Sequence, residues 1–229
     1  TNYRTLSPIS TSTTNSDGTI LTHTRKFAFN ETTAPYTEMI GKNIIDLDFG
    51  GDISNGKGES YGLKKEFRKE RNHFVIDLIK SGKNGVFEHR FKYLNYDMYF
   101  NPREIIRYPS EHVVYLWGYG GKYPIAEIKN ATYEEVKIAL DDPLEAFITT
   151  IGSKVEPSIS DFSKLAQLRS RLPRATITTF TYKPLVGMTS MTDPRGITEY
   201  YQYDGFQRLK EVLDFDKNLL QNYHYHYKP

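Results

Sequence analysis

Apolar and polar residues alternate in several runs along this chain, and a period of two is typical of β-strands with one buried face. Alternating runs cover residues 19–29, 43–49, 61–71, 73–80 and 86–96, with shorter runs at 105–108 and 113–117. Turn signals separate the runs. Gly50-Gly51-Asp52 is expected to end one strand, and Asn84-Gly85 is typical of a tight hairpin. The pattern therefore predicts a mostly β fold with an antiparallel sheet.

Residues 132–172 interrupt this alternation with helical spacing. Thr132 followed by Glu135 predicts a capping box before a helix over 133–140. Asp142-Pro143 predicts the start of a second helix over 143–151. Apolar residues at helical spacing predict a third helix over 160–171, which Pro173 ends. This insertion is expected to pack on a rim or a face of the sheet, and its role as lid, plug or spacer stays open.

The carboxy-terminal segment, residues 175–227, repeats itself at an interval of 21 to 22 residues. An offset of 21 relates Tyr182 to Tyr203, and an offset of 22 relates Tyr203 to Tyr225. The same offsets relate Phe180 to Tyr201 to Tyr223, Met188 to Leu209, Met191 to Val212 and Asp193 to Asp214. Such a period predicts an array in which each unit buries its apolar face against its neighbours. The aromatic residues are therefore expected to lie on adjacent or near-adjacent strands and to be mostly buried, with Tyr223, Tyr225 and Tyr227 on one face of the last strand.

Turns and bulges are expected inside each unit. Turn signals occur at residues 193–196, 204–205 and 214–218. A spacing of three from Met188 to Met191, and again from Leu209 to Val212, breaks strict alternation. An extra residue in one strand of an antiparallel pair produces such a break, so we predict a β-bulge at each place.

The unit at residues 201–214 resembles the RHS or YD repeat, whose pattern runs roughly YxYDxxGRLxxVxDxxGxxxxYxYD. Tyr201, Tyr203-Asp204, Arg208-Leu209, Val212 and Asp214 match it, whereas Gln207 and Lys217 stand where the family prefers glycine. In the preceding unit Lys183 replaces the aspartate and Gly187 the arginine, but Asp193 and Gly196 fit. Residues 93–97 look like a worn copy of the repeat, and residues 115–133 are similar to one bacterial RHS subgroup. The resemblance covers about half of the chain, from near Val113 to the end.

This resemblance implies a curved antiparallel β-sheet that forms a segment of a β-shell. The positions that carry the structural repeat are Phe180, Tyr182, Met188, Asp193, Gly196, Tyr201, Tyr203, Asp204, Arg208, Leu209, Val212, Asp214, Tyr223 and Tyr225. Residues 1–131 would form a degenerate repeat region, 132–173 the helical insertion and 174–229 the YD-repeat hairpins, all in one continuous structural unit. The implied function is a structural wall or closing segment of a secreted shell that encapsulates or delivers a C-terminal toxin or effector, as in polymorphic toxins. The alternative is a cell-surface adhesin or glycan-binding module.

Composition and charge limit the classes of partner that this chain is expected to bind. The formal net charge of the 229 residues is +2, so nothing calls for nucleic acid as a partner. No apolar run is long enough for a transmembrane helix, and we expect no direct membrane insertion. The chain starts at Thr1 and neither end looks capped, which predicts a piece of a longer protein. Its expected partners are the remainder of the same RHS polypeptide or a partner subunit, together with secretion or outer-membrane machinery, and its expected location is secreted or at the bacterial cell surface.

Several residues suit enzyme or metal chemistry but have simpler interpretations. His224 and His226 have the spacing of two metal ligands on one strand face, and Asp46 and Asp48 that of paired carboxylates. Both pairs are more often solvated polar positions. Asp193-Pro194-Arg195-Gly196 is interpreted as the turn of the repeat, although it is similar to the DPxG element of self-cleaving RHS toxins. The basic run Lys64, Lys65, Arg68, Lys69 and Arg71 is diluted by Glu66 and Glu70 and predicts a surface strand. With no cysteine and no converging catalytic set, we expect no catalytic site, no metal and no cofactor.

Overall fold

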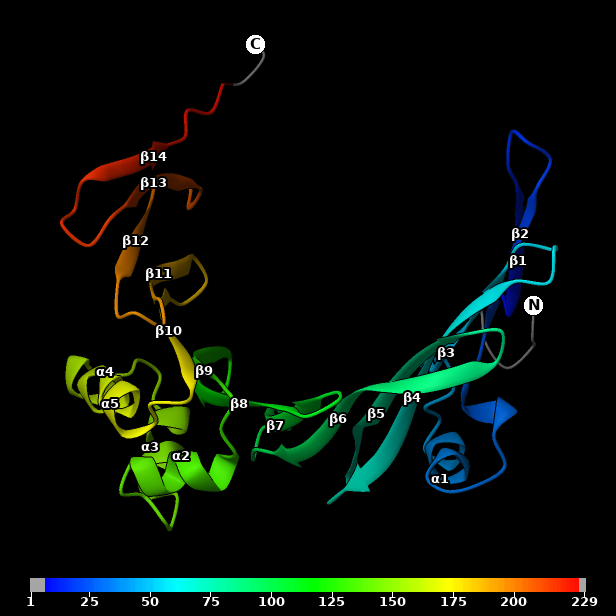
Figure 1. Cartoon of the computed structure of the whole chain (residues 1–229), viewed down its shortest axis with the longest axis horizontal. Helices are drawn as coiled ribbons and strands as arrows, with labels where there is room; N and C mark the ends of the chain where they lie inside the picture. The colour runs from blue at the N-terminus through cyan, green and yellow to red at the C-terminus, as the bar shows by residue number, and fades with distance from the viewer. Residues whose placement is uncertain (1–6, 227–229) are drawn as a thin grey trace. The chain divides into compact units, whose positions relative to one another are not determined.

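The computed structural model describes residues 7–226 and shows a β-rich chain with a few short helices (Figure 1). Within these residues fourteen strands form one antiparallel sheet in which the strands follow one another in sequence order. The mostly β, antiparallel prediction is therefore confirmed. The strands are β1 Ser10–Thr14, β2 Ile20–Arg25, β3 Gly50–Ser54, β4 Ser60–Glu70, β5 His73–Lys83, β6 Val86–Tyr96, β7 Pro102–Arg107, β8 Glu111–Gly118, β9 Tyr123–Lys129, β10 Thr176–Lys183, β11 Gly187–Thr192, β12 Thr198–Tyr203, β13 Leu209–Leu213 and β14 Leu219–Asn222.

The chain divides into two compact units, and each is described here by itself. Unit 1 consists of Thr1–Leu94 with Ile106–Ser110, and unit 2 of Asn95–Ile105 with Glu111–Pro229. One continuous unit was expected. The division instead falls near the end of β6, well before the helical insertion.

Unit 1 contains the longest strands and one small core. A short 3₁₀ helix, Ala28–Asn30, and α1, Tyr36–Gly41, follow β2. Met39 of α1 and Ala28 are fully buried against Phe49, with Phe67 of β4 packed beside them. The helix α1 was not predicted from the sequence, in which Pro35 indicated only a loop.

The predicted strand at residues 43–49 is wrong, because these residues form no strand and β3 begins only at Gly50. Gly50-Gly51 was expected to end a strand and instead starts one. A Cβ on Gly50 would lie 2.0 Å from the Leu63 carbonyl oxygen, and a Cβ on Gly51 would lie 1.8 Å from that of Thr24. Glycine is therefore needed here for close approach of the neighbouring strands, not for a turn.

The hairpin between β5 and β6 forms at the predicted Asn-Gly pair. Asn84 and Gly85 both have positive φ, 52° and 82°, which is the conformation that a type I′ turn requires. Lys83 pairs with Val86 across the turn. Residues 81–83 therefore belong to β5, so the strand is longer and the turn shorter than the sequence predicted.

The main core lies in unit 2, where the helical insertion packs on a face of β8, β9 and β10. The helices are α2 Tyr133–Ala139, α3 Ala146–Ser153, α4 Ile159–Ala166 and α5 Leu168–Arg171. Buried side chains of the strands, such as Leu116 and Ile128, form one cluster with Val136, Ile151 and Leu165 of the helices. Complete burial of each such side chain contributes about 1.5–3 kcal/mol, so this cluster anchors the insertion to the sheet.

The insertion starts as predicted but its second helix starts later. Thr132 and Glu135 form the expected capping box, in which the Thr132 N–H donates to Glu135 Oε2 at 2.7 Å. Asp142 accepts hydrogen bonds from the N–H groups of Phe147 and Ile148, at 3.0 and 2.9 Å. Asp142 therefore satisfies two N–H groups of the first turn of α3 although it lies four residues before the helix, which begins at Ala146 instead of residue 143.

Candidate functional site

The aspartate of the repeat closes a hairpin turn between β12 and β13. The Asp204 N–H donates to the Arg208 carbonyl, and the Gln207 N–H donates to the Asp204 carbonyl, both at 2.9 Å. Its side chain adds more bonds, since Oδ1 accepts from the Phe206 and Arg208 N–H groups at 2.8 and 3.0 Å. Oδ2 accepts from Arg208 Nε at 2.8 Å. One carboxylate thus satisfies the inward backbone donors of the loop, as an Asx turn does.

The same arrangement, which we call the Asp-centred turn, recurs at Asp193, Asp214 and Asp97. In each, the aspartate N–H donates to the carbonyl four residues on, and Oδ1 accepts from the N–H of that residue. Asn55 builds the turn with an amide oxygen, which accepts from the Lys57 and Glu59 N–H groups at 2.9 and 3.2 Å. The worn copy of the repeat that was predicted near Asp97 therefore has the same local structure as the clear copies.

Glycine is favoured but not required at the fourth residue of this turn. That residue has positive φ in every Asp-centred turn, at Phe100 (64°), Gly196 (85°), Gln207 (63°) and Lys217 (66°). The carboxylate network holds the non-glycine residues in the left-handed region, which explains how Gln207 and Lys217 occupy the position that Gly196 has in its turn. Where Lys183 replaces the aspartate, the turn differs: positive φ moves to Leu185 (65°).

The turn aspartates of the clear repeats, Asp193, Asp204 and Asp214, are charged acceptors. Hydrogen bonds lower the pKa of each carboxyl below its ordinary value of 3.8. The main cause is the Ile197 N–H for Asp193, the Arg208 side chain for Asp204 and the Asn218 side chain for Asp214. These three residues are called the repeat-turn aspartates below.

Both predicted bulges are present. Thr181 pairs with Ser190 and Tyr182 with Met188, which leaves Thr189 as the extra residue of β11. Gln202 pairs with Glu211 and Tyr203 with Leu209, which leaves Lys210 as the extra residue of β13. A bulge bends its strand and increases the local twist, so each repeat introduces a bend at the same place.

The aromatic residues of the first two units lie where they were predicted. Phe180 and Tyr182 on β10, and Tyr201 and Tyr203 on β12, are intermediate in exposure, and β11 lies between the two strands. The larger part of each side chain is shielded from solvent, as expected for near-adjacent strands of the repeat. Tyr203 Oη donates to the Met188 carbonyl at 2.8 Å.

The last aromatic pair lies outside the strand to which it was assigned. β14 ends at Asn222, and Tyr223 and Tyr225 follow it with 40% and 44% of their surfaces exposed. Tyr225 folds back on the preceding hairpin, where its hydroxyl donates to the Leu209 carbonyl at 2.7 Å and its ring lies 4.3 Å from the Arg208 guanidinium carbon. Tyr227, predicted on the same strand, lies outside the described residues. Of the other repeat positions, Val212 is buried, Met188 and Leu209 are half-buried and Gly196 is exposed.

The residues that suited enzyme or metal chemistry do not converge. His224 and His226 are exposed after β14. Asp46 and Asp48 precede β3 in non-strand backbone, and Asp48 Oδ1 accepts from the Gly50 N–H at 2.7 Å. Between residues 7 and 226 no cluster of three or more His, Asp or Glu side chains is arranged to hold a metal ion. Over the same range, no helix is both long and apolar enough to span a membrane.

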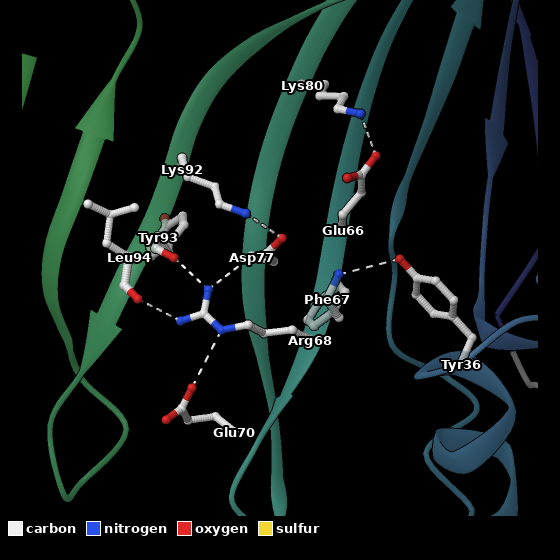
Figure 2. Close-up of polar contacts among 10 residues, drawn as sticks. All are labelled: Tyr36, Glu66, Phe67, Arg68, Glu70, Asp77, Lys80, Lys92, Tyr93 and Leu94. Carbon is white, nitrogen blue, oxygen red and sulfur yellow. Dashed lines mark hydrogen bonds and ion pairs between the residues drawn. The ribbon is translucent and has the colours of Figure 1, made fainter. Parts of the chain in front are cut away.

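A polar network surrounds Arg68, a residue that the sequence pattern assigned to a surface strand. Figure 2 shows the guanidinium reaching from β4 across β5 to β6. Arg68 Nη1 donates to Asp77 Oδ1 and to the Tyr93 carbonyl, both at 2.6 Å, and Nη2 donates to the Leu94 carbonyl at 3.0 Å. Lys92 Nζ donates to the other oxygen of Asp77 at 2.6 Å. Arg68 therefore links three strands through two backbone carbonyls and one carboxylate.

Asp77 occupies a bulge in β5, because Glu66 pairs with Leu78 and Phe67 with Ile76. Burial raises the pKa of Asp77, but hydrogen bonds and charge from Lys92 and Arg68 outweigh burial and lower it below 3.8. The carboxylate is thus held charged between two cations. A signal was present in the sequence, since Asp77 is the single charged residue inside the apolar run Phe74–Ile79, written FVIDLI.

A scan against protein-family models finds none that matches the chain, and a search of curated proteins finds no similar sequence. The features that bear on its function are therefore the Asp-centred turns, the regular bulges and the exposed aromatic pair Tyr223 and Tyr225.

Proposed function

We propose that this chain is a structural wall or closing segment of a secreted RHS-repeat shell, at the bacterial cell surface or exported, that encloses or delivers a C-terminal toxin or effector. The recurrence of the Asp-centred turn carries the proposal. In the Tyr-Asp pair of the repeat, the aspartate is the residue whose carboxylate closes the hairpin, at Asp204 and at the worn copy, Asp97. The clear and the degenerate copies of the repeat within this chain therefore share one local structure, which supports the proposal.

The strand order supports a wall. Each strand bonds to the strands that neighbour it in sequence, so the sheet grows by adding hairpins without rearranging earlier ones. Regular bulges at Thr189 and Lys210 introduce twist and bends, the features by which sheets curve. In this proposal the chain acts through its shape and contributes no catalysis, metal or cofactor.

The partner in this proposal is the remainder of the same polypeptide or a second subunit, placed beside β14. This strand pairs with β13 and ends the described sheet, and Leu219 and Leu220 are 56% and 52% exposed. An edge strand with exposed apolar side chains favours pairing with a further strand. A stable contact of this kind buries more than about 1,000 Å² of surface.

Protease protection tests the wall. In the polypeptide that naturally carries residues 1–229, we expect the segment that follows the chain to resist a soluble protease. Replacing all three repeat-turn aspartates with alanine should expose it, because the hairpins lose their carboxylate bonds. Asp216→Ala, at an exposed position inside the Asp214 turn, leaves the Asp214 carboxylate and its bond from the Asn218 N–H in place and should leave protection unchanged. Equal digestion of the unchanged protein and of both variants would overturn the proposal. A native polypeptide with a mass of only 26.5 kDa, that of residues 1–229 alone, would overturn it too.

The exposure of Tyr223 and Tyr225 favours a second candidate, a cell-surface adhesin or glycan-binding module. Exposed tyrosines supply a flat apolar face with a polar tip, which suits contact surfaces. Glycan-array binding that is lost in Tyr223→Ala and Tyr225→Ala but retained in Tyr61→Ala would support this candidate. Tyr61 is a matched control because it is also exposed, at 56%.

A further inference from the structure

A pocket of about 350 Å³ opens in unit 1 between β4, the start of α1 and the end of β2. Its lining combines positive, negative and aromatic side chains. They are Lys26, Lys64 and Lys65; Glu31, Glu66 and Asp77; and Tyr36, Phe49 and Phe67.

Two of the three carboxylates are already neutralised from outside the pocket. Lys80 Nζ lies 2.6 Å from Glu66 Oε1, and Asp77 is held by Arg68 and Lys92, each at 2.6 Å (Figure 2). These carboxylates are therefore poor partners for further cations. Only Glu31, which is exposed, offers an unshared negative charge.

The lysines of the pocket are not neutralised in this way. Across residues 7–226, Lys26, Lys64 and Lys65 form no ion pair, although all three are half-buried. The Lys64 ammonium lies 4.3 Å from the centroid of the Phe87 ring. Lys64 therefore contributes positive charge near the pocket, and direct contact with a ligand is left to Lys26 and Lys65. Lys65 Nζ contacts the Asp48 carbonyl at 3.5 Å. A partly buried ammonium without a counter-charge is costly, and an anion in the pocket would remove that cost.

The aromatic wall is held rigidly. Phe49 is 5% exposed, and its ring centroid lies 4.9 Å from that of Tyr36 and 5.0 Å from that of Phe67. The Phe67 N–H donates to Tyr36 Oη at 3.3 Å, which fixes the tyrosine against the edge of β4 (Figure 2). A flat apolar group would find a preformed surface here.

We propose that this pocket binds an organic anion with a flat apolar body. Lys26 and Lys65 contact the anionic head, and Tyr36, Phe49 and Phe67 pack on the body. Lysine binds as a point charge and lacks the fork geometry that selects planar head groups. A carboxylate and a phosphate head are therefore both included, and the experiment separates them. This binding activity lies beyond the proposed role in a shell wall and does not depend on it.

The test is isothermal titration calorimetry of the whole chain with benzoate and with phenyl phosphate. These ligands carry a carboxylate and a phosphate head group, respectively, on the same phenyl ring. Benzamide supplies the ring without charge, and inorganic phosphate supplies charge without the ring. We expect at least one aryl anion to bind about tenfold or more tighter than benzamide and than phosphate, since one charged contact of about 1.4 kcal/mol gives tenfold. The tighter aryl anion identifies the head group. Equal affinities for the aryl anions and benzamide, or for the aryl anions and phosphate, would overturn the proposal.

Variants locate the binding. The double variant Lys26→Gln, Lys65→Gln should weaken binding by about tenfold or more, and Lys26→Arg, Lys65→Arg should restore it because charge is retained. Lys57→Gln, at an exposed lysine of the β3–β4 loop, should bind as the unchanged chain does. A circular dichroism spectrum like that of the unchanged chain shows that each variant is folded. Undiminished binding in the folded glutamine variant, or an equal loss in Lys57→Gln, would place the anion elsewhere and contradict the proposal.

Discussion

Replacing Asp97 with alanine should destabilise unit 2, because Asp97 closes an Asp-centred turn and is 9% exposed. Its carboxylate accepts from the Tyr99 N–H at 2.8 Å, the Asn101 N–H at 2.9 Å and Asn101 Nδ2 at 3.2 Å. Hydrogen bonds to a charged group contribute about 1.5–3 kcal/mol each, but water reaches part of this loop and replaces some of them. We therefore expect a loss of about 2–4 kcal/mol in the free energy of unfolding.

Asparagine at the same position should cost much less. Asn55 shows that one amide oxygen accepts both backbone N–H groups of this turn, at 2.9 and 3.2 Å. Asp97→Asn keeps that oxygen and loses the bond from the Asn101 side chain, so we expect a loss of about 1 kcal/mol. Asp216→Ala, at an exposed position, should stay within about 0.5 kcal/mol of the unchanged chain.

Urea unfolding followed by tryptophan fluorescence measures these differences in unit 2. Trp117 is the single tryptophan, and its Nε1 donates to the carbonyl of Pro102, next to the turn, at 2.9 Å. A midpoint for Asp97→Ala that matches that of Asp216→Ala would refute the assignment of the carboxylate as the closing element of the turn. If the dependence of the unfolding free energy on urea concentration differs between variants, their unfolding free energies can no longer be compared directly.

Three further outcomes are expected. Gly187→Ala should destabilise the chain by about 1–3 kcal/mol in urea unfolding, because its Cβ would lie 2.3 Å from Tyr203 Oη; an unchanged midpoint would contradict the observed packing. The pKa values of the repeat-turn aspartates are lower in the folded state, so these carboxylates stabilise the hairpins above pH 3.8 and lose this effect as pH falls through the lowered pKa values. The amide protection factors of β12 and β13, which are corrected for the intrinsic exchange rate at each pH, should therefore be smaller at pH 2 than at pH 6. Equal protection factors at pH 2 and pH 6 would argue against this role. Arg68→Met should lower the stability of unit 1 by about 2–4 kcal/mol, because it removes the hydrogen bonds from Arg68 to the Tyr93 and Leu94 carbonyls and leaves Asp77 with one cation. Arg68→Lys should not restore the stability, since a single ammonium cannot reproduce the guanidinium fork. Full recovery by lysine in circular dichroism melts would disprove that role.

The local features of the repeat could be predicted from sequence because their causes are local. An aspartate four residues before the end of its turn, and a spacing of three between Leu209 and Val212, each specify a structure within one hairpin. The capping box at Thr132 is of the same kind. Each depends on bonds between residues close in sequence, which alternation and turn chemistry report directly.

Features that depend on distant partners could not be predicted. Residues 43–49 alternate like a strand but form none: the backbone of Phe49 bonds to Lys26 and Lys65, and its ring packs with α1. Arg68 sits among charges that suggest a surface, yet its partners Asp77 and Tyr93 come from two other strands. The exposure of Tyr223 and Tyr225 also depends on what covers the end of the sheet, which their own alternation does not specify.

Electron cryo-microscopy of the natural polypeptide that carries residues 1–229 tests the proposed shell wall most directly. The proposal predicts a closed β-walled particle in which β14 pairs with a further strand and the Asp-centred turns line up along the wall. A particle with no enclosed volume, in which the free edge of β14 and the rings of Tyr223 and Tyr225 face solvent, would contradict it.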